Sequence, residues 1–217
     1  MGMMVSPEQN QTAVDSFLEA MNGRFSGSGV EGSVEKRSSM QANSFVRIIT
    51  PPQHWTGLAK WMRFEQNINY CAMITGTHYP DGPDERGWEV AIHLLRIPLL
   101  VAKPHTCHEF KASELEGDLL PLEIEVRIPL PQGDSPSVPS VQMVWEGADW
   151  NEKETWDLVG IQFDGHENMH RVLNPHDSPA GFHPLQRQHK IRYHDYNEMY
   201  DDPQGFGRKP VDEGRVK

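Results

Sequence analysis

Apolar and polar residues alternate most regularly over residues 122–128, where leucine, isoleucine and valine are separated by glutamate and arginine. This period of two predicts a strand with one dry face and one wet face. Other runs rich in β-branched and aromatic residues predict strands at residues 44–50, 69–75, 88–97, 141–145 and 155–163. Because these strands follow one another as a meander, they favour an antiparallel sheet.

Helical spacing of apolar residues predicts a helix over residues 6–23. Ser6 begins an S-x-x-Q capping box, Pro7 suits the first helical position, and Gly23 suits the end of the helix. A second, short helix is expected after the two prolines at positions 51 and 52, where tryptophan, leucine and methionine recur at helical spacing.

The chain divides into four predicted segments. They are a helical arm (1–23), a Gly/Ser-rich linker (24–43), a β-rich domain (44–175), and a His-rich segment with an extended tail (176–217). The predicted fold class is α+β, an N-terminal helical arm on an antiparallel β-rich domain with an irregular C-terminal tail. The apolar stripe of the arm must be buried, either on its own domain or on another subunit.

Composition narrows the function classes. The chain has 217 residues, and its 31 acidic residues exceed its 20 basic residues to give a net charge of −11, which argues against nucleic acid as a partner. We expect no membrane span and no secretory signal, because no apolar run is long enough for the first and residues 1–11 lack the apolar core of the second. With two cysteines, no disulfide framework is expected, and the expected location is cytoplasmic.

Most of the negative charge lies in residues 109–157, which hold 12 acidic and 3 basic residues. Charge of this kind is typical of solvated sheet faces and loops. A second interpretation is a docking surface for a basic partner, or mimicry of nucleic-acid charge. Both interpretations place these acidic side chains on the surface.

Histidines gather late in the sequence, where six of the eleven fall within a 29-residue stretch. Two of them, His166 and His170, form an H-E-x-x-H motif around Glu167. His176 follows at the spacing of a third ligand, with Asp177 beside it. In a helix, residues four apart share one face, so the first two histidines could grip one zinc ion.

This spacing resembles the zinc-binding segment of the metzincin peptidases, H-E-x-x-H-x-x-G-x-x-H. The resemblance implies a zinc-dependent hydrolase built on residues 166–176, with zinc as its cofactor. Leu173 stands where that family has glycine. The candidate metal ligands are His166, His170, His176 and Asp177, and the candidate general base is Glu167.

The same segment also fits a hairpin. The Asp-Gly pair at positions 164 and 165 is a strong turn signal after the predicted strand, so residues 166–172 would return as a second strand. At roughly 3.3 Å per residue, His166 and His170 would then stand about 13 Å apart. One zinc ion cannot bridge that distance, so this backbone excludes the peptidase site.

The sequence contains no Walker loop, no G-x-G-x-x-G and no G-x-S-x-G. We therefore expect a non-catalytic interaction protein, a subunit or accessory of a larger assembly. Its expected partners are other protein subunits or further copies of itself, and its predicted contact elements are residues 1–23 and 201–217. The alternative is the metal-dependent zinc hydrolase that uses residues 166–176.

Overall fold

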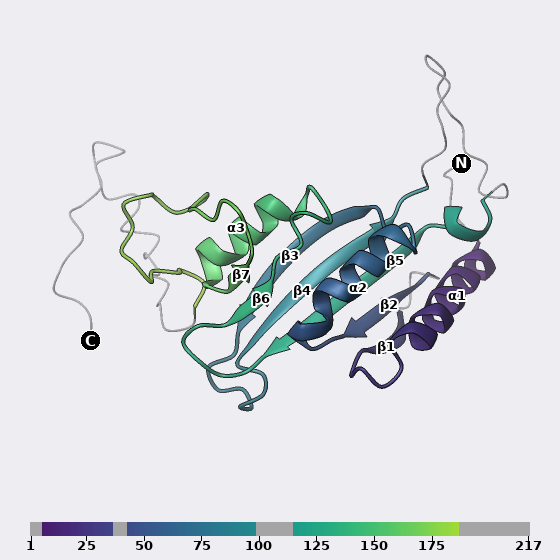
Figure 1. Ribbon diagram of the computed structural model, residues 1–217, viewed down its shortest axis with the longest axis horizontal. Helices are drawn as coiled ribbons and strands as arrows, with labels where there is room; N and C mark the ends of the chain where they lie inside the picture. Colours follow the sequence, from purple (N-terminus) through teal and green to yellow (C-terminus); the bar gives the residue numbers. More distant parts are fainter. Residues whose placement is uncertain (1–5, 37–42, 99–114, 187–217) are drawn as a thin grey trace, which may run out of the picture. The chain divides into compact units, whose positions relative to one another are not determined.

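The computed structural model describes residues 6–36, 43–98 and 115–186, and five strands in these ranges form one mixed sheet in the order β1-β2-β5-β4-β3 (Figure 1). The strands are β1 (Glu31–Lys36), β2 (Ser44–Ile49), β3 (Tyr70–His78), β4 (Trp88–Arg96) and β5 (Leu122–Leu130). All neighbouring pairs are antiparallel except β2 and β5, which are parallel. The predicted α+β fold is confirmed, with a sheet that is mostly rather than wholly antiparallel.

The strand register places alternate residues on opposite faces of this sheet. One row of register partners faces the helices: Gly32, Ile48, Val126, Ile92 and Ile74. The adjacent row faces the other way: Ser33, Arg47, Glu125, His93 and Met73. We call the first the inner face and the second the outer face.

Three helices lie against the inner face: α1 (Pro7–Phe25), α2 (Pro52–Phe64) and α3 (Ala148–Val159). Figure 1 shows α2 crossing the middle of the sheet, and the contacts place α1 on β1 and β2 and α3 on β3. A 3₁₀ turn, η2 (Gly117–Leu119), precedes β5. A separate parallel pair joins β6 (Ser137–Pro139) to β7 (Gln162–Asp164). Within the described ranges, no helix is long and apolar enough to cross a bilayer.

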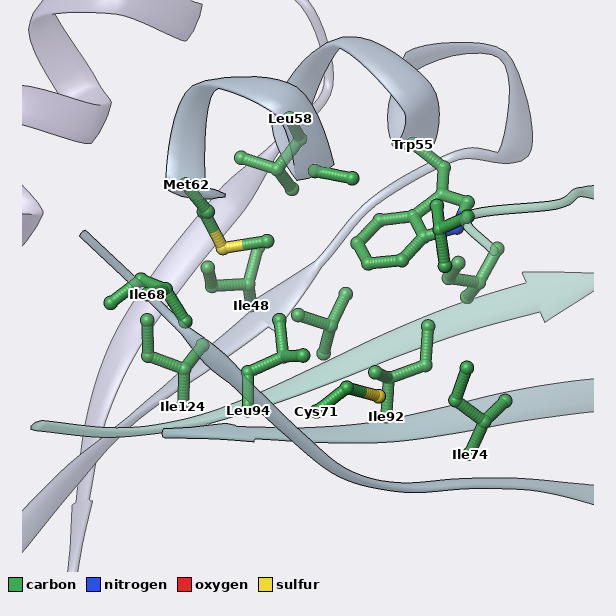
Figure 2. Close-up of a cluster of buried hydrophobic side chains, with 14 of the residues drawn as sticks. Ile48, Trp55, Leu58, Met62, Ile68, Cys71, Ile74, Ile92, Leu94 and Ile124 are labelled. Atoms are coloured by element: carbon green, nitrogen blue, oxygen red, sulfur yellow. The ribbon is translucent and has the colours of Figure 1, made fainter. Parts of the chain in front are cut away.

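The hydrophobic core fills the space between α2 and the sheet. Figure 2 shows Leu58 and Met62 of α2 above Ile48, Leu94 and Ile124 of the inner face. All five side chains are fully buried. Burying an aliphatic side chain of this size contributes about 1.5–3 kcal/mol, so this layer fixes α2 on the sheet.

The N-terminal helix is built as its sequence predicts. Ser6 Oγ accepts a hydrogen bond from the Gln9 backbone N–H at 3.2 Å, and the Gln9 side chain accepts one from the Ser6 N–H at 3.1 Å. Phe17 is buried, and its ring centroid lies 5.3 Å from that of Trp61 in α2. The apolar stripe of α1 is therefore buried within the chain itself, as the first of the two alternatives expects, and a contact of this arm with another subunit stays a prediction.

The predicted linker, residues 24–43, contains β1, which pairs with β2 along its whole length. The prediction of a flexible linker is therefore wrong for residues 31–36, while residues 37–42 and the predicted tail at 201–217 lie outside the described residues. A Cβ atom at Gly32 would collide with the Met21 side chain. Glycine in this stretch thus lets α1 approach β1 closely, which composition alone does not reveal.

The strand predicted at residues 141–145 is wrong, and of the one predicted at 155–163 only residues 162 and 163 are strand, in β7. Residues 142–144 form a turn, and α3 covers residues 148–159. Apolar and β-prone residues do recur at helical spacing in α3, but the buried stripe also includes a fully buried glutamate, Glu152. Because a charged residue occupies a core position of α3, the apolar residues alone do not show the spacing of a helix.

The predicted hairpin at residues 164 and 165 is wrong as well. Gly160, at a φ of 93°, ends α3, and the chain then forms only the short strand β7. Gly165 does occupy a turn, at a φ of 83°, but residues 166–186 continue as turns and bends. Where a returning strand would lie, the N–H groups of Val172, Leu173 and Asn174 bind the Asp157 carboxylate of α3 instead of a neighbouring strand.

Candidate functional site

Charged side chains gather at the centre of the outer face, away from the three helices. Glu89 and Glu125 are only 3% and 4% exposed, although they lie on the face that no described helix covers. Arg47 on β2 is the direct register partner of Glu125 on β5. Burying carboxylates costs free energy unless cations and hydrogen-bond donors satisfy them. The side chains around Glu89 and Glu125 therefore have to supply such groups.

Arg127 connects the two buried carboxylates. Its Nη1 donates a hydrogen bond to Glu89 Oε1 at 2.8 Å, and its Nε donates one to Glu125. Arg47 Nη2 lies 3.6 Å from Glu125 Oε2, and Arg86 forms a further ion pair with Glu89. We call these five side chains the outer-face network; it joins β2, β4 and β5.

The network sets the charge state of its members. Burial would raise the pKa of Glu125, but the hydrogen bond from Arg127 and the positive charges around it outweigh burial and lower that pKa. Burial would lower the pKa of Arg127, whereas its carboxylate partners raise it. Both groups are therefore ionised at neutral pH, and each holds the other in place.

A pocket of about 380 Å³ opens at this network. Its lining residues are Arg47, Ile49, Arg86, Glu89, Arg127 and Pro129. Arg47 Nε is buried and has no hydrogen-bond partner among the described residues. Guanidinium groups match the planar geometry of carboxylates, so a pocket lined by three arginines suits an anionic group.

A second set of buried charges lies on α3. The fully buried Glu152 carboxylate accepts hydrogen bonds from Ser140 Oγ at 2.6 Å and from the Val141 N–H at 2.8 Å. Burial raises the pKa of Glu152 to about 7, against the effect of these hydrogen bonds, and the charge of Asp149 raises it further. Glu152 thus ties the segment that precedes α3 to the helix.

Asp157 of α3 is also fully buried and holds residues 171–174. Its carboxylate accepts a hydrogen bond from Arg171 Nη1 at 2.7 Å, and further ones from the N–H groups of Leu173 at 2.9 Å and Asn174 at 2.8 Å. Burial would raise its pKa, but these donors outweigh burial and hold that pKa well below the usual range of a carboxyl group. Asp157 therefore attaches the segment after β7 to α3.

The predicted metal ligand His166 contacts Asp149 of α3. The side chain of His166 is fully buried, with Nε2 3.2 Å from Asp149 Oδ1. Its Nδ1 accepts a hydrogen bond from the Asn168 N–H at 3.2 Å. Both ring nitrogens are therefore engaged by groups of this chain.

The other predicted site residues share an exposed environment: Glu167, His170, His176 and Asp177. The peptidase geometry requires one helix through both histidines of the motif, and residues 166–170 are not helical. Across the described ranges, no three His, Cys, Asp or Glu side chains are grouped to hold a metal ion. The zinc hypothesis gains no geometric support from these residues and stays a prediction.

Comparison with known families gives the context for these features. A family model described as the 30 Kd subunit of respiratory-chain NADH dehydrogenase matches residues 48–195, which is more than half of the chain. The chain belongs to this family. The match to the 30 Kd subunit family includes all of α3 and four members of the outer-face network, but it begins one residue after Arg47. Membership confirms the predicted role at its coarser level, a subunit of a larger assembly.

Three curated relatives show the extent of the similarity. The C subunit of NADH-quinone oxidoreductase from Nocardioides sp. is 31% identical over 130 residues, which are 60% of this chain and 40% of that protein. The C subunit from Moorella thermoacetica is 28% identical over 145 residues, 67% of this chain and 80% of that protein. The C/D subunit from Gluconacetobacter diazotrophicus is 42% identical over 86 residues, 40% of this chain and 13% of that protein. The match thus spans less than half of the first and third relatives.

Two solved structures have a fold similar to that of this chain. The trypsin-resistant fragment of Nqo5 is 20% identical, with a TM-score of 0.50 over 70% of this chain and 98% of that chain. A chain in the structure of the membrane-bound sulfane sulfur reductase, an archaeal respiratory membrane complex, is 16% identical. Its TM-score is 0.57, over 92% of this chain and 96% of that chain. At these identities, the likeness concerns the fold.

Sequence reasoning missed the outer-face network. It placed Glu125 with solvated acidic side chains, whereas Arg47 and Arg127 bury it. The alternation in residues 122–128 does contain one signal, an arginine two positions after a glutamate on the same face of a strand. The partners on β2 and β4 carry no such signal, because strand register is needed to bring them together.

Proposed function

We propose that the protein is a non-catalytic, peripheral subunit of a membrane-bound respiratory NADH-quinone oxidoreductase and acts by binding other subunits of that complex. The observation that carries this proposal is the family match over residues 48–195. The two relatives from Nocardioides and Moorella, both C subunits of this enzyme, support the same role. The partners are then other protein subunits, in line with the prediction of an interaction protein.

The geometry is consistent with a binding role. The buried charges on α3 engage backbone and side-chain groups of the chain itself, so they stabilise its conformation. The outer face instead presents charged and apolar groups together with a pocket. Such a surface suits contact with another protein.

The proposal changes the expected location from free in the cytoplasm to bound to a membrane complex. The sequence predicts a cytoplasmic protein without a membrane link, whereas the sulfane sulfur reductase relative belongs to a respiratory membrane complex. We place this chain on the cytoplasmic side of such a complex, attached through neighbouring subunits.

The test is co-purification from the source organism. The chain carries a small affinity tag at one end, membranes are solubilised in a mild detergent, and the bound material is separated on a native gel. We expect the chain to migrate with the named subunits of NADH-quinone oxidoreductase, identified by mass spectrometry. We also expect deletion of its gene to lower NADH-quinone reductase activity of the membranes. A chain that migrates alone, together with unchanged activity in the deletion strain, would contradict the proposal.

A further inference from the structure

We infer that the pocket of the outer-face network receives a carboxylate side chain of a partner subunit, so that the outer face is a surface by which this chain joins its complex. The inference rests on the proposed function and specifies its contact surface. It assigns one kind of occupant to the pocket, an aspartate or glutamate of another chain.

The donors in the pocket match such an occupant. Arg47, Arg86 and Arg127 line one opening of about 380 Å³. Arg47 Nε is buried yet donates no hydrogen bond to any described group. A buried donor without an acceptor costs about 1–3 kcal/mol, and an incoming carboxylate oxygen would remove this cost. Arginine is also the residue that holds carboxylates through paired hydrogen bonds.

The charge of the site selects a single carboxylate. The side chains of Glu89 and Glu125 are 4% and 6% exposed, and together they balance two of the three arginines. The remaining positive charge is balanced by Glu35, which pairs with Arg47, so a partner carboxylate would take the place of Glu35. Glu35 lies 3.2 Å from Arg47 at the rim, but it is 39% exposed, and such pairs are screened by water and easily exchanged. A phosphate group, which carries more negative charge, fits this balance less well.

The exposed apolar side chains elsewhere on the outer face favour a protein as the source of the carboxylate. Tyr70, Met73 and Ile49 also lie on the outer face and are 49%, 42% and 45% exposed. Tyrosine, methionine and arginine are enriched in the cores of protein interfaces. A small soluble anion would use the arginines and leave these apolar side chains in water, whereas a protein partner would cover both.

The first experiment maps the occupant within the assembled complex. Ile49 lines the pocket, so the variant Ile49→p-benzoylphenylalanine places a photoreactive group at its wall. The tagged variant is purified with the complex, illuminated, and analysed by mass spectrometry. We expect a cross-link to a peptide of another subunit that contains an aspartate or glutamate near the cross-linked residue. Cross-links only to residues 99–114 or 187–217 of the same chain, or only to lipid, would overturn the inference.

The second experiment measures the contribution of the arginines. The double variant Arg47→Gln/Arg86→Gln keeps Arg127, which the two buried carboxylates require. We expect it to bind the remaining subunits roughly thirtyfold more weakly than the wild type, the effect typical of truncating a buried interfacial charge. Arg24→Gln is the matched control, because Arg24 also pairs with a glutamate but lies on α1, outside the pocket. It should bind as the wild type does.

The outcomes separate this inference from the proposed function. If the wild type does not co-purify with the complex, the proposed function fails. If the wild type co-purifies and the double variant, with an unchanged melting temperature, binds equally well, the pocket inference alone fails. If the double variant does not fold, the cross-link from position 49 tests the pocket inference.

Discussion

Replacing Asp157 with alanine removes the carboxylate that attaches residues 171–174 to α3. In the wild type, this carboxylate accepts hydrogen bonds from Arg171, from the N–H groups of Val172, Leu173 and Asn174, and from the Asn174 side chain, at distances of 2.7–3.1 Å. Alanine leaves these donors without their acceptor in a site where Asp157 is fully buried. The change therefore tests whether one buried charge holds the whole segment.

The expected loss of stability follows from the positive charge of Arg171, which remains after the carboxylate is removed. Removing one partner of a buried ion pair costs about 3–5 kcal/mol, because the other charge is left uncompensated. Arg171 keeps two carbonyl acceptors, Phe182 O and Pro179 O, each at 3.0 Å. We therefore expect Asp157→Ala to lower the free energy of unfolding by about 3 kcal/mol, at the lower end of that range. Asp157→Asn should cost a similar amount, because both carboxylate oxygens accept hydrogen bonds and an amide NH₂ at either position would face donors.

The assay is urea denaturation combined with limited proteolysis. We expect a lower urea midpoint for Asp157→Ala and new cleavage within residues 165–186. The control is Asp177→Ala, because Asp177 is an exposed aspartate in the same segment and its loss should change stability by less than about 0.5 kcal/mol. Equal stability and equal protease resistance of Asp157→Ala and wild type would refute the reasoning.

The same carboxylate gives a pH dependence with a definite sign. The pKa of Asp157 is lowered in the folded chain, so the folded state binds its proton less tightly than the unfolded state. The stability that it contributes is complete above the unfolded pKa of about 3.9 and is lost as the pH falls below that value. The gap between wild type and Asp157→Ala should thus be constant from about pH 5 upward and shrink in stronger acid.

Three further predictions concern the rest of the chain. The pKa of Glu152 in the folded chain is raised to about 7, so the wild type should lose up to about 3 kcal/mol of stability as the pH rises from about 4.5 to 7. Urea midpoints measured at pH 5 and pH 8 should show this loss in the wild type and not in Glu152→Gln. Gly76→Ala would place a Cβ 2.7 Å from Ile161 Cδ1 and should lower the melting temperature, whereas Gly57→Ala, with nothing within 4 Å in an exposed turn of α2, should raise it. Elemental analysis of untagged protein tests the zinc prediction for residues 166–177: a stoichiometry near one supports it, and one near zero removes it.

Local sequence signals predict the elements whose patterns are simple. The strict alternation of residues 122–128 becomes β5, and the capped apolar stripe of residues 6–23 becomes α1. These elements obey one period over many residues, so the backbone state follows from local information. The parallel pairing of β2 with β5 does not follow, because it depends on how α2 connects distant strands.

The errors at α3 and on the outer face share one physical cause, which is that charged residues occupy buried positions where a sequence pattern expects apolar ones. In α3, Glu152 and Asp157 lie at buried positions and disguise a helix as a mixture of polar and β-prone residues. On the outer face, Glu125 reads as a solvated residue although its arginine partners bury it. A buried charge is stable only beside partners from other elements, and those partners are invisible until the register is known.

The two sets of buried charges differ in what they leave unsatisfied, and this difference bears on function. On α3, Asp157 is surrounded by donors of its own chain, so it stabilises a conformation. On the outer face, Glu89 and Glu125 are also buried, yet one arginine that lines the pocket, Arg47, has a buried Nε with no hydrogen-bond partner among the described residues. A surface that another subunit will cover must have most of its charges paired beforehand, because unpaired charges oppose desolvation. An interface that receives a carboxylate therefore requires arginines and glutamates that are already paired with one another, with one arginine donor left for the incoming group. A sheet face that stays in water has no need to bury glutamates.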